Sequence, residues 1–188
     1  FFETIAKLRA ARRLHARIAV DRDRMDPPAV KCPPVNTNLA GSAMTRQQPV
    51  FNVIRSTVQA LASLLGGVNG MEIKAYTEVM SSSTTAALVI NRGIEAILAE
   101  ETGACQTVDP LAGSYYVEWL TNQVEAGARG LLDEILGRGG MRACIESGWV
   151  QALVEEGARQ RQRELEERRR IQVGVNAYQA LVEPEISL

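Results

Sequence analysis

The spacing of hydrophobic residues predicts four helices before the last forty residues. From Thr4 to Arg24, leucine and isoleucine recur at helical spacing among basic side chains, which predicts an amphipathic helix with a basic outer face. A second helix is predicted after Pro49 and ends at Leu65, where Gly66-Gly67 closes it. The same spacing predicts helices over residues 84–101 and 115–136.

Two other segments have the pattern of strands. Residues 70–77 alternate Met, Ile and Ala with polar partners, and residues 105–108 are a candidate for one more short strand. Residues 109–114, with Pro110 and Gly113, are typical of a turn. Strands that alternate with helices indicate βα units with parallel strands, and therefore the α/β class.

The segments between and after these units are polar. Four prolines between Asp26 and Pro34 forbid a continuous helix and predict a loop. Residues 150–170 predict a long exposed helix, in which Glu155–Arg159, Glu164–Arg168 and Glu166–Arg170 have the i,i+4 spacing of ion pairs. Residues 171–178 are typical of a short extended segment that leaves the domain.

Composition narrows the class of protein. The 188 residues are 46% hydrophobic and 23% charged, with a net charge of −1, which is the profile of a globular domain with one core or of part of a larger one. Uncharged apolar runs are too short for a membrane span. Aromatic residues make up 5% of the chain and do not interleave with the arginines, so we expect no nucleic-acid partner.

The cysteines and the histidine predict no metal site. Cys32, Cys105 and Cys144 are far apart, and they form no metal-binding spacing with His15. We interpret them as reduced thiols of a cytoplasmic protein. The first residues, Phe1-Phe2-Glu3, lack the order of a signal peptide, so we expect the chain to be processed or part of something longer.

Catalytic residues are not evident from motifs alone. The sequence has no phosphate-binding, zinc-protease or nucleophile-elbow motif, and Gly66-Gly67 and Gly139-Gly140 are better explained as helix endings. Glu78 follows the predicted strand, and in βα barrels that edge carries ligand contacts. An equally good interpretation of Glu78 is a carboxylate that complements the dipole of the following helix.

Several motifs in order resemble the substrate-binding barrel of methylmalonyl-CoA mutase and its relatives. These are Ala10–Leu14, Met44–Pro49, Asn52–Arg55, Gly66-Gly67, Glu100–Gly103, Asp109-Pro110 with Gly113–Tyr115, Gly139–Met141, and Val173–Asn176 with Tyr178. The resemblance covers almost the whole chain but only the later part of the family's barrel.

The resemblance implies a partial TIM-type (β/α)8 barrel of the α/β class. It would comprise about the last three βα units with a preceding helix and a helical C-terminal extension, over residues 1–178, with residues 179–188 as a tail or linker. The family uses adenosylcobalamin to rearrange the carbon skeleton of an acyl-CoA by a radical route, and the cofactor supplies that chemistry.

The resemblance also assigns candidate site residues. The family's HCQTSG strand corresponds here to residues 36–41, which places Asn36 and Asn38 at the substrate and Gly41 at the cofactor. Glu78 matches an acidic residue that lies by the cofactor in the family. Asn36 replaces a histidine and Asn38 a glutamine, and the family's TQSLHTN strand reads as residues 68–74 here without its glutamine and histidine. These changes predict a substrate other than methylmalonyl-CoA.

The family's early barrel strands and its cobalamin-binding domain have no counterpart in this sequence. Three βα units cannot close an eight-stranded barrel, so we expect the chain alone to be inactive. Its expected partner is a chain with the first barrel half and a cobalamin-binding domain, a second copy, or the rest of a longer enzyme. The alternative is a noncatalytic interaction or regulatory module that kept the barrel scaffold and lost the site.

Overall fold

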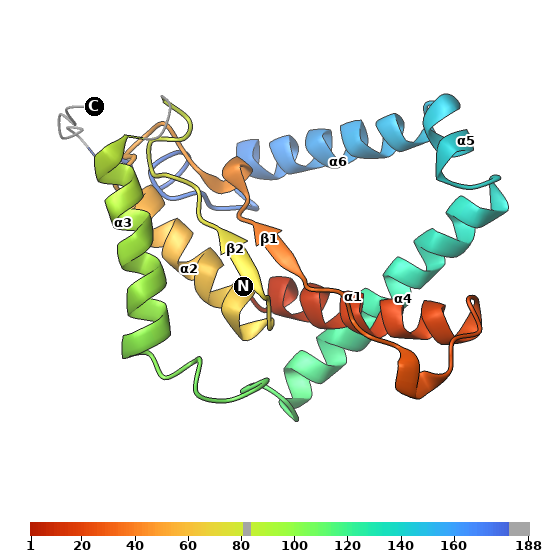
Figure 1. Ribbon diagram of the computed structural model, residues 1–188. Helices are drawn as coiled ribbons and strands as arrows, with labels where there is room; N and C mark the ends of the chain where they lie inside the picture. The colour runs from red at the N-terminus through yellow and green to blue at the C-terminus, as the bar shows by residue number, and fades with distance from the viewer. Residues whose placement is uncertain (81–83, 181–188) are drawn as a thin grey trace. The chain divides into compact units, whose positions relative to one another are not determined.

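The computed structural model describes residues 1–80 and 84–180 (Figure 1). The chain divides into two compact units, residues 1–127 and the residues from 128 onward. Helix α4 (Tyr115–Gly137) contributes its first turns to the first unit and its last turns to the second. Each unit is described separately below.

A small parallel sheet lies at the centre of the first unit. Strand β1 (Asn36–Asn38) pairs with β2 (Gly70–Glu72), with Asn36 opposite Gly70 and Asn38 opposite Glu72. Helix α2 (Phe51–Leu65) lies between the two strands in the sequence, as a parallel crossover requires (Figure 1). The predicted α/β class with parallel strands is confirmed.

One face of this sheet packs on helices. Alternate side chains of a strand point to opposite faces, and Leu39 and Ile73, just after the strands, point toward α2 and α3 (Thr85–Ala96). The cluster of buried residues consists of Leu39, Ala60, Ile73, Ile94 and Leu98. Each large aliphatic side chain contributes roughly 1.5–3 kcal/mol by burial, so this core determines which face of the sheet is covered.

Helix α3 begins and ends near its predicted limits. The Thr84 hydroxyl accepts a hydrogen bond from the Ala87 N–H at 3.2 Å, which caps the first turn. The helix then continues as a π-helical turn, η3 (Ile97–Glu101). Two short 3-10 turns complete the unit: η1 (Pro27–Ala29) in the proline-rich loop and η2 (Gly41–Ala43) after β1.

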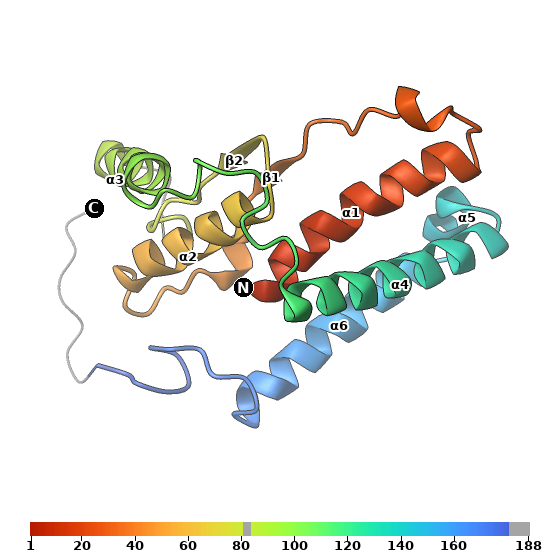
Figure 2. The same ribbon diagram turned by 90° about the horizontal axis from the view of Figure 1, so that it is seen from below.

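Helix α1 (Phe2–Asp21) packs on α2 and on the start of α4 (Figure 2). A second cluster of buried residues joins them through Ile5, Ala62 and Val117. The C-terminal end of α2 lies close against α1. A Cβ on Gly66, the residue that follows α2, would lie 2.5 Å from Leu8 Cδ1.

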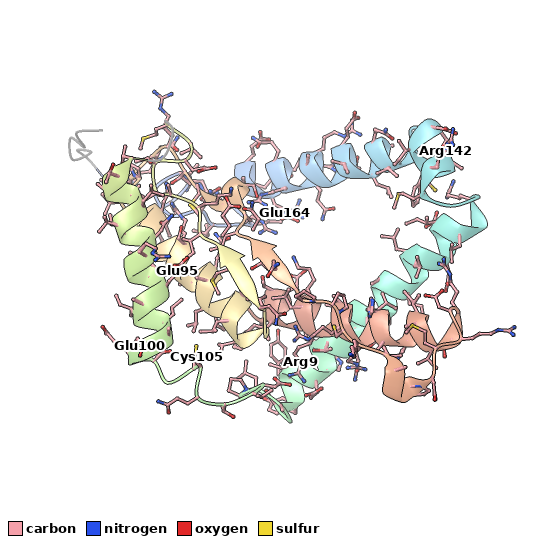
Figure 3. The ribbon with its side chains drawn as sticks, viewed as in Figure 1. Arg9, Glu95, Glu100, Cys105, Arg142 and Glu164 are labelled. Atoms are coloured by element: carbon pink, nitrogen blue, oxygen red, sulfur yellow. The ribbon has the colours of Figure 1, made fainter. Side chains whose placement is uncertain are left out.

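The arginines of α1 all contact groups of the first unit. The predicted basic outer face is therefore correct only in part: Lys7 and Arg17 are exposed, whereas Arg9, Arg12 and Arg13 are half-buried. Arg9 donates to Asp109 and Glu118, Arg12 donates to the carbonyls of Gly66 and Gly67, and Arg13 and Arg17 both pair with Glu125. Arg9, labelled in Figure 3, has only 11% of its side chain exposed. The predicted helix is confirmed, but the acidic residues that contact it come from distant parts of the sequence.

The second unit is helical. After α4, Gly139 and Gly140 both have φ of 93°, and they separate α4 from α5 (Met141–Glu146), a helix too short for its period to be predicted. Gly148 then precedes α6 (Trp149–Glu166). The Arg138 guanidinium lies 4.6 Å from the centre of the Trp149 ring, a cation–π contact that joins the ends of α4 and α6.

The ion pairs of α6 agree only in part with the predicted spacing. Glu155 and Arg159 pair at 4.0 Å, but Glu164 pairs with Arg170 at 3.1 Å instead of Arg168, and Glu166 accepts from Gln162 instead of pairing with Arg170. The helix ends at Glu166, so residues 168 and 170 no longer have helical positions. Exposed pairs of this kind each contribute about 0–1 kcal/mol.

Two predicted extended segments are not strands. Residues 105–108 form an irregular loop with Val108 95% exposed, so within residues 1–80 and 84–180 the sheet has two strands. Residues 171–178 form a turn closed by a bridge between Val173 and Ala177. The Asn176 amide holds this turn by donating to the carbonyls of Leu165 and Arg170.

No helix in the described part of the chain is both long and apolar enough to cross a membrane.

Gly66 and Gly93 offer a matched pair of substitutions that tests the α1–α2 contact. Gly66→Ala should lower the free energy of unfolding by about 1–3 kcal/mol, because its Cβ would overlap Leu8. Gly93→Ala should raise it by up to about 1 kcal/mol, because nothing lies within 4 Å of the added methyl and alanine favours a helix. Urea denaturation measures both, and equal effects would contradict the close approach.

Glu118 should stabilise the fold by an amount that falls at low pH. The Gly113 N–H and then Arg9 lower the pKa of Glu118. A lowered pKa in the folded state stabilises the protein above the unfolded value of about 4.3, and this contribution is lost as pH falls through the folded pKa. Glu118→Gln should therefore lower the urea midpoint at pH 7, with a difference that disappears in strong acid. Glu100→Gln, an exposed control, should show neither effect.

Candidate functional site

The face of the β1–β2 sheet opposite the helices is polar and exposed. The register places Asn36 beside Gly70 and Asn38 beside Glu72 on this face, and both asparagines are exposed. An open depression of about 380 Å³ lies here. It is lined by Asn36, Thr37, Asn38, Gly70, Met71 and Glu72. Exposed amide and carboxylate groups are able to bind a polar ligand by hydrogen bonds.

Four side chains form a continuous polar chain along this face. The Asn38 amide donates to Glu72 Oε2 at 2.8 Å, and Lys74 Nζ donates to Glu72 Oε1 at 2.9 Å. Lys74 Nζ also lies 3.7 Å from Glu78 Oε1. With two carboxylates and one ammonium, this cluster has one net negative charge. The hydrogen bond to Glu72 raises the pKa of Lys74 above its ordinary value, and the nearby charge of Glu78 contributes. We call Asn38, Glu72, Lys74 and Glu78 the strand-end cluster.

Asn36 lies at the other end of the depression. A Cβ at Gly70 would lie 2.9 Å from Asn36 Oδ1, so the missing side chain at position 70 makes room for the asparagine. Within the part of the chain that the structure describes, the Asn36 amide makes no hydrogen bond. It is therefore available to a ligand.

Gly41 and Glu78 occupy the loops that follow the two strands. Gly41 begins η2, and nothing lies within 4 Å of the position that its Cβ would occupy, so a ligand has access to the backbone there. Glu78 lies before the Thr84 cap of α3 and outside its first turn. The interpretation of Glu78 as a carboxylate at the helix start is therefore wrong, since its charged partner is Lys74.

Helices α2 and α3 hold the backbone at the end of β2. Three backbone carbonyls just after β2 accept side-chain hydrogen bonds: Ile73 from Asn91, Lys74 from Ser56 and Tyr76 from Asn52, at 2.8, 3.0 and 3.0 Å. Ser56 and Asn52 are buried. Because these bonds fix residues 73–76, the side chains of Lys74 and Glu78 start from a rigid base.

The sequence analysis names Asn38 and Glu78 as candidates, and the structure brings them into one cluster through Glu72 and Lys74, which the sequence analysis does not single out. In the sequence, Glu72 and Lys74 are only the polar half of an alternating strand. Glu72 and Lys74 are two residues apart, and Lys74 and Glu78 are four apart. In an extended chain these even spacings indicate that Glu72, Lys74 and Glu78 share one face. The pairing of Asn38 with Glu72 depends on the strand register, which no local pattern indicates.

Metal binding by this region has no support in the described ranges. No group of three or more His, Cys, Asp or Glu side chains there is arranged to hold a metal ion.

Comparisons with known proteins identify the family of this chain. The sequence model of the methylmalonyl-CoA mutase family matches residues 1–188. Methylmalonyl-CoA mutase of Escherichia coli K12 is 37% identical over 177 residues, which are 94% of this chain and 25% of that protein. The enzyme of the same name from Rhizobium meliloti is 36% identical over 190 residues, which are 100% of this chain and 26% of that protein.

A relative with a different substrate in its name is similar at nearly the same level. The 2-hydroxyisobutanoyl-CoA mutase large subunit of Aquincola tertiaricarbonis is 34% identical over 178 residues, 95% of this chain and 32% of that protein. The chain belongs to the methylmalonyl-CoA mutase family, whose members are isomerases. It spans about a quarter to a third of the length of these relatives.

Gly70→Ala tests the space beside Asn36. The added methyl would displace the Asn36 amide, which is the end of a flexible side chain, so the free energy of unfolding should change by less than about 1 kcal/mol. The Asn36 side-chain amide signals in an NMR spectrum should move, while those of Asn91 stay in place. Unchanged Asn36 signals would contradict this geometry.

Proposed function

We propose that this chain forms one wall of the ligand site in an adenosylcobalamin-dependent acyl-CoA mutase. The observation that carries the proposal is the uncovered polar face of the β1–β2 sheet in a member of this family. The wall belongs to the later part of a TIM-type barrel, with Asn36 and Asn38 at the substrate and Gly41 and Glu78 at the cofactor.

The donor set fits a large polar cofactor. Exposed amides, a carboxylate and an accessible glycine backbone are suited to hydrogen bonds with a ligand rather than to coordination of its metal. When bound, adenosylcobalamin supplies the radical chemistry of the rearrangement. The residues of this chain bind and orient: Asn36 and Asn38 contact the acyl-CoA, Glu78 accepts hydrogen bonds, and the core beneath excludes water from the back of the sheet.

The substrate is an acyl-CoA other than methylmalonyl-CoA. The strand-end cluster has one net negative charge, so it disfavours an acyl group that carries a free carboxylate and tolerates an uncharged one. The replacement of histidine and glutamine by Asn36 and Asn38 supports the same conclusion, because it removes a titratable donor and shortens an amide.

The rest of the barrel and a cobalamin-binding domain come from another segment or a partner chain. Strand β1 pairs with β2 along one edge, and its other edge has no strand partner within the described ranges. An open strand edge pairs readily with further strands. The free thiols of Cys32, Cys105 and Cys144 favour the cytoplasm as the compartment.

The alternative function is a noncatalytic interaction or regulatory module. It is favoured by the strand-end cluster itself, where the Asn38 amide and both oxygens of Glu72 are already engaged with protein groups. Such a module would bind its partner chain and neither CoA nor cobalamin.

Turnover and binding by the complete protein that carries this chain separate the two functions. With adenosylcobalamin, an acyl-CoA with an uncharged acyl group, such as isobutanoyl-CoA or a hydroxyacyl-CoA, should have kcat/KM at least about tenfold above methylmalonyl-CoA, a difference of about 1.4 kcal/mol. Turnover of methylmalonyl-CoA with the others rejected would overturn the substrate assignment. Calorimetry that detects binding of neither CoA nor cobalamin would establish the noncatalytic alternative.

A further inference from the structure

We propose that Lys74 is a positioning residue of this site: its ammonium group, held between Glu72 and Glu78, fixes the ligand-facing carboxylate of Glu78. This inference rests on the proposed function, because it takes Glu78 as a cofactor contact. Lys74 itself touches no ligand in this proposal and acts through Glu78.

The burial of the three charged side chains identifies Lys74 as the inner member. Its side chain is 18% exposed, whereas those of Glu72 and Glu78 are 64% and 38% exposed. A lysine is normally the residue that extends into solvent, because its long chain has much rotamer freedom to lose. Here the order is reversed, and the lysine lies beneath the two carboxylates that it joins.

Hydrogen bonds hold Lys74 both at its backbone and at its ammonium group. At the backbone, its carbonyl accepts the hydrogen bond of the buried Ser56, and the neighbouring Ile73 carbonyl is held by Asn91. At the ammonium, Glu72 Oε1 lies at 2.9 Å, and Glu72 is in turn held by Asn38. Lys74 Nζ is therefore placed by groups from β1, β2, α2 and α3.

Glu78 depends on this placement. Its backbone N–H donates to the Ala75 carbonyl at 3.0 Å within a turn, and Lys74 is the partner of its carboxylate among residues 1–80 and 84–180. Without the ammonium, Glu72 and Glu78 would be like charges on one face with no cation between them. Glu78 would then turn away into solvent.

The test uses the complete protein, four single variants and one double variant. The measurements are the equilibrium affinity for adenosylcobalamin, followed by its visible absorbance, and kcat and KM for the acyl-CoA that the protein turns over. Lys74→Met should weaken cofactor binding about fivefold, the upper range for a single exposed pair, while Lys74→Arg should restore binding to within about twofold. Lys31→Met removes an exposed lysine elsewhere in the first unit and should change nothing.

A double-mutant cycle with Glu78→Gln separates positioning from general stability. If Lys74 acts through Glu78, Lys74→Met should cause no further loss of affinity in the Glu78→Gln background. An equal loss in both backgrounds would overturn the proposal, as would Lys74→Met with wild-type affinity. Lys74→Gln takes the place of Lys74→Met if that variant does not fold.

The same measurements distinguish failure of this inference from failure of the proposed function. If Glu78→Gln weakens binding and Lys74→Met does not, Glu78 is a cofactor contact that needs no positioning by Lys74. If the protein binds no cobalamin, the proposed function fails and the positioning role fails with it.

Discussion

The packing of one face of the β1–β2 sheet on α2 and α3 is the constraint on which the rest of the structure depends. Leu39 and Ile73 are buried against these helices, and the alternation of side chains along a strand then sends their neighbours to the opposite face. Asn38, Glu72 and Lys74 therefore lie together on that face, where Asn38 and Glu72 are exposed and Lys74 is half-buried. A shift of either strand by one residue would bury charge and expose the core, so the same packing sets both stability and site.

The face of the sheet opposite the helices has amides and charges. Hydrogen bonds from Asn52, Ser56 and Asn91 hold the backbone just after β2, so the exposed polar groups of that face start from a fixed backbone. In the proposed function, these groups form part of the wall that faces the ligands.

Elements with strong local signals could be predicted from the sequence, and contacts between distant segments could not. The period of α2 and its closing glycines located that helix well, and the α/β class followed from alternation of elements. The predicted strand at residues 105–108 is wrong because this short segment has no pairing partner among the described residues. The role of Arg9 was missed because Asp109 and Glu118 lie about a hundred residues away.

The central claim, that the polar face of the β1–β2 sheet is a ligand wall of an acyl-CoA mutase, is tested most directly by a crystal structure. The complete protein would be crystallised with cobalamin and an unreactive acyl-CoA analogue. The account predicts that Asn36, Asn38 or Glu78 lies within hydrogen-bond distance of one of these ligands. A structure in which this face packs against protein, with both ligands elsewhere, would contradict it.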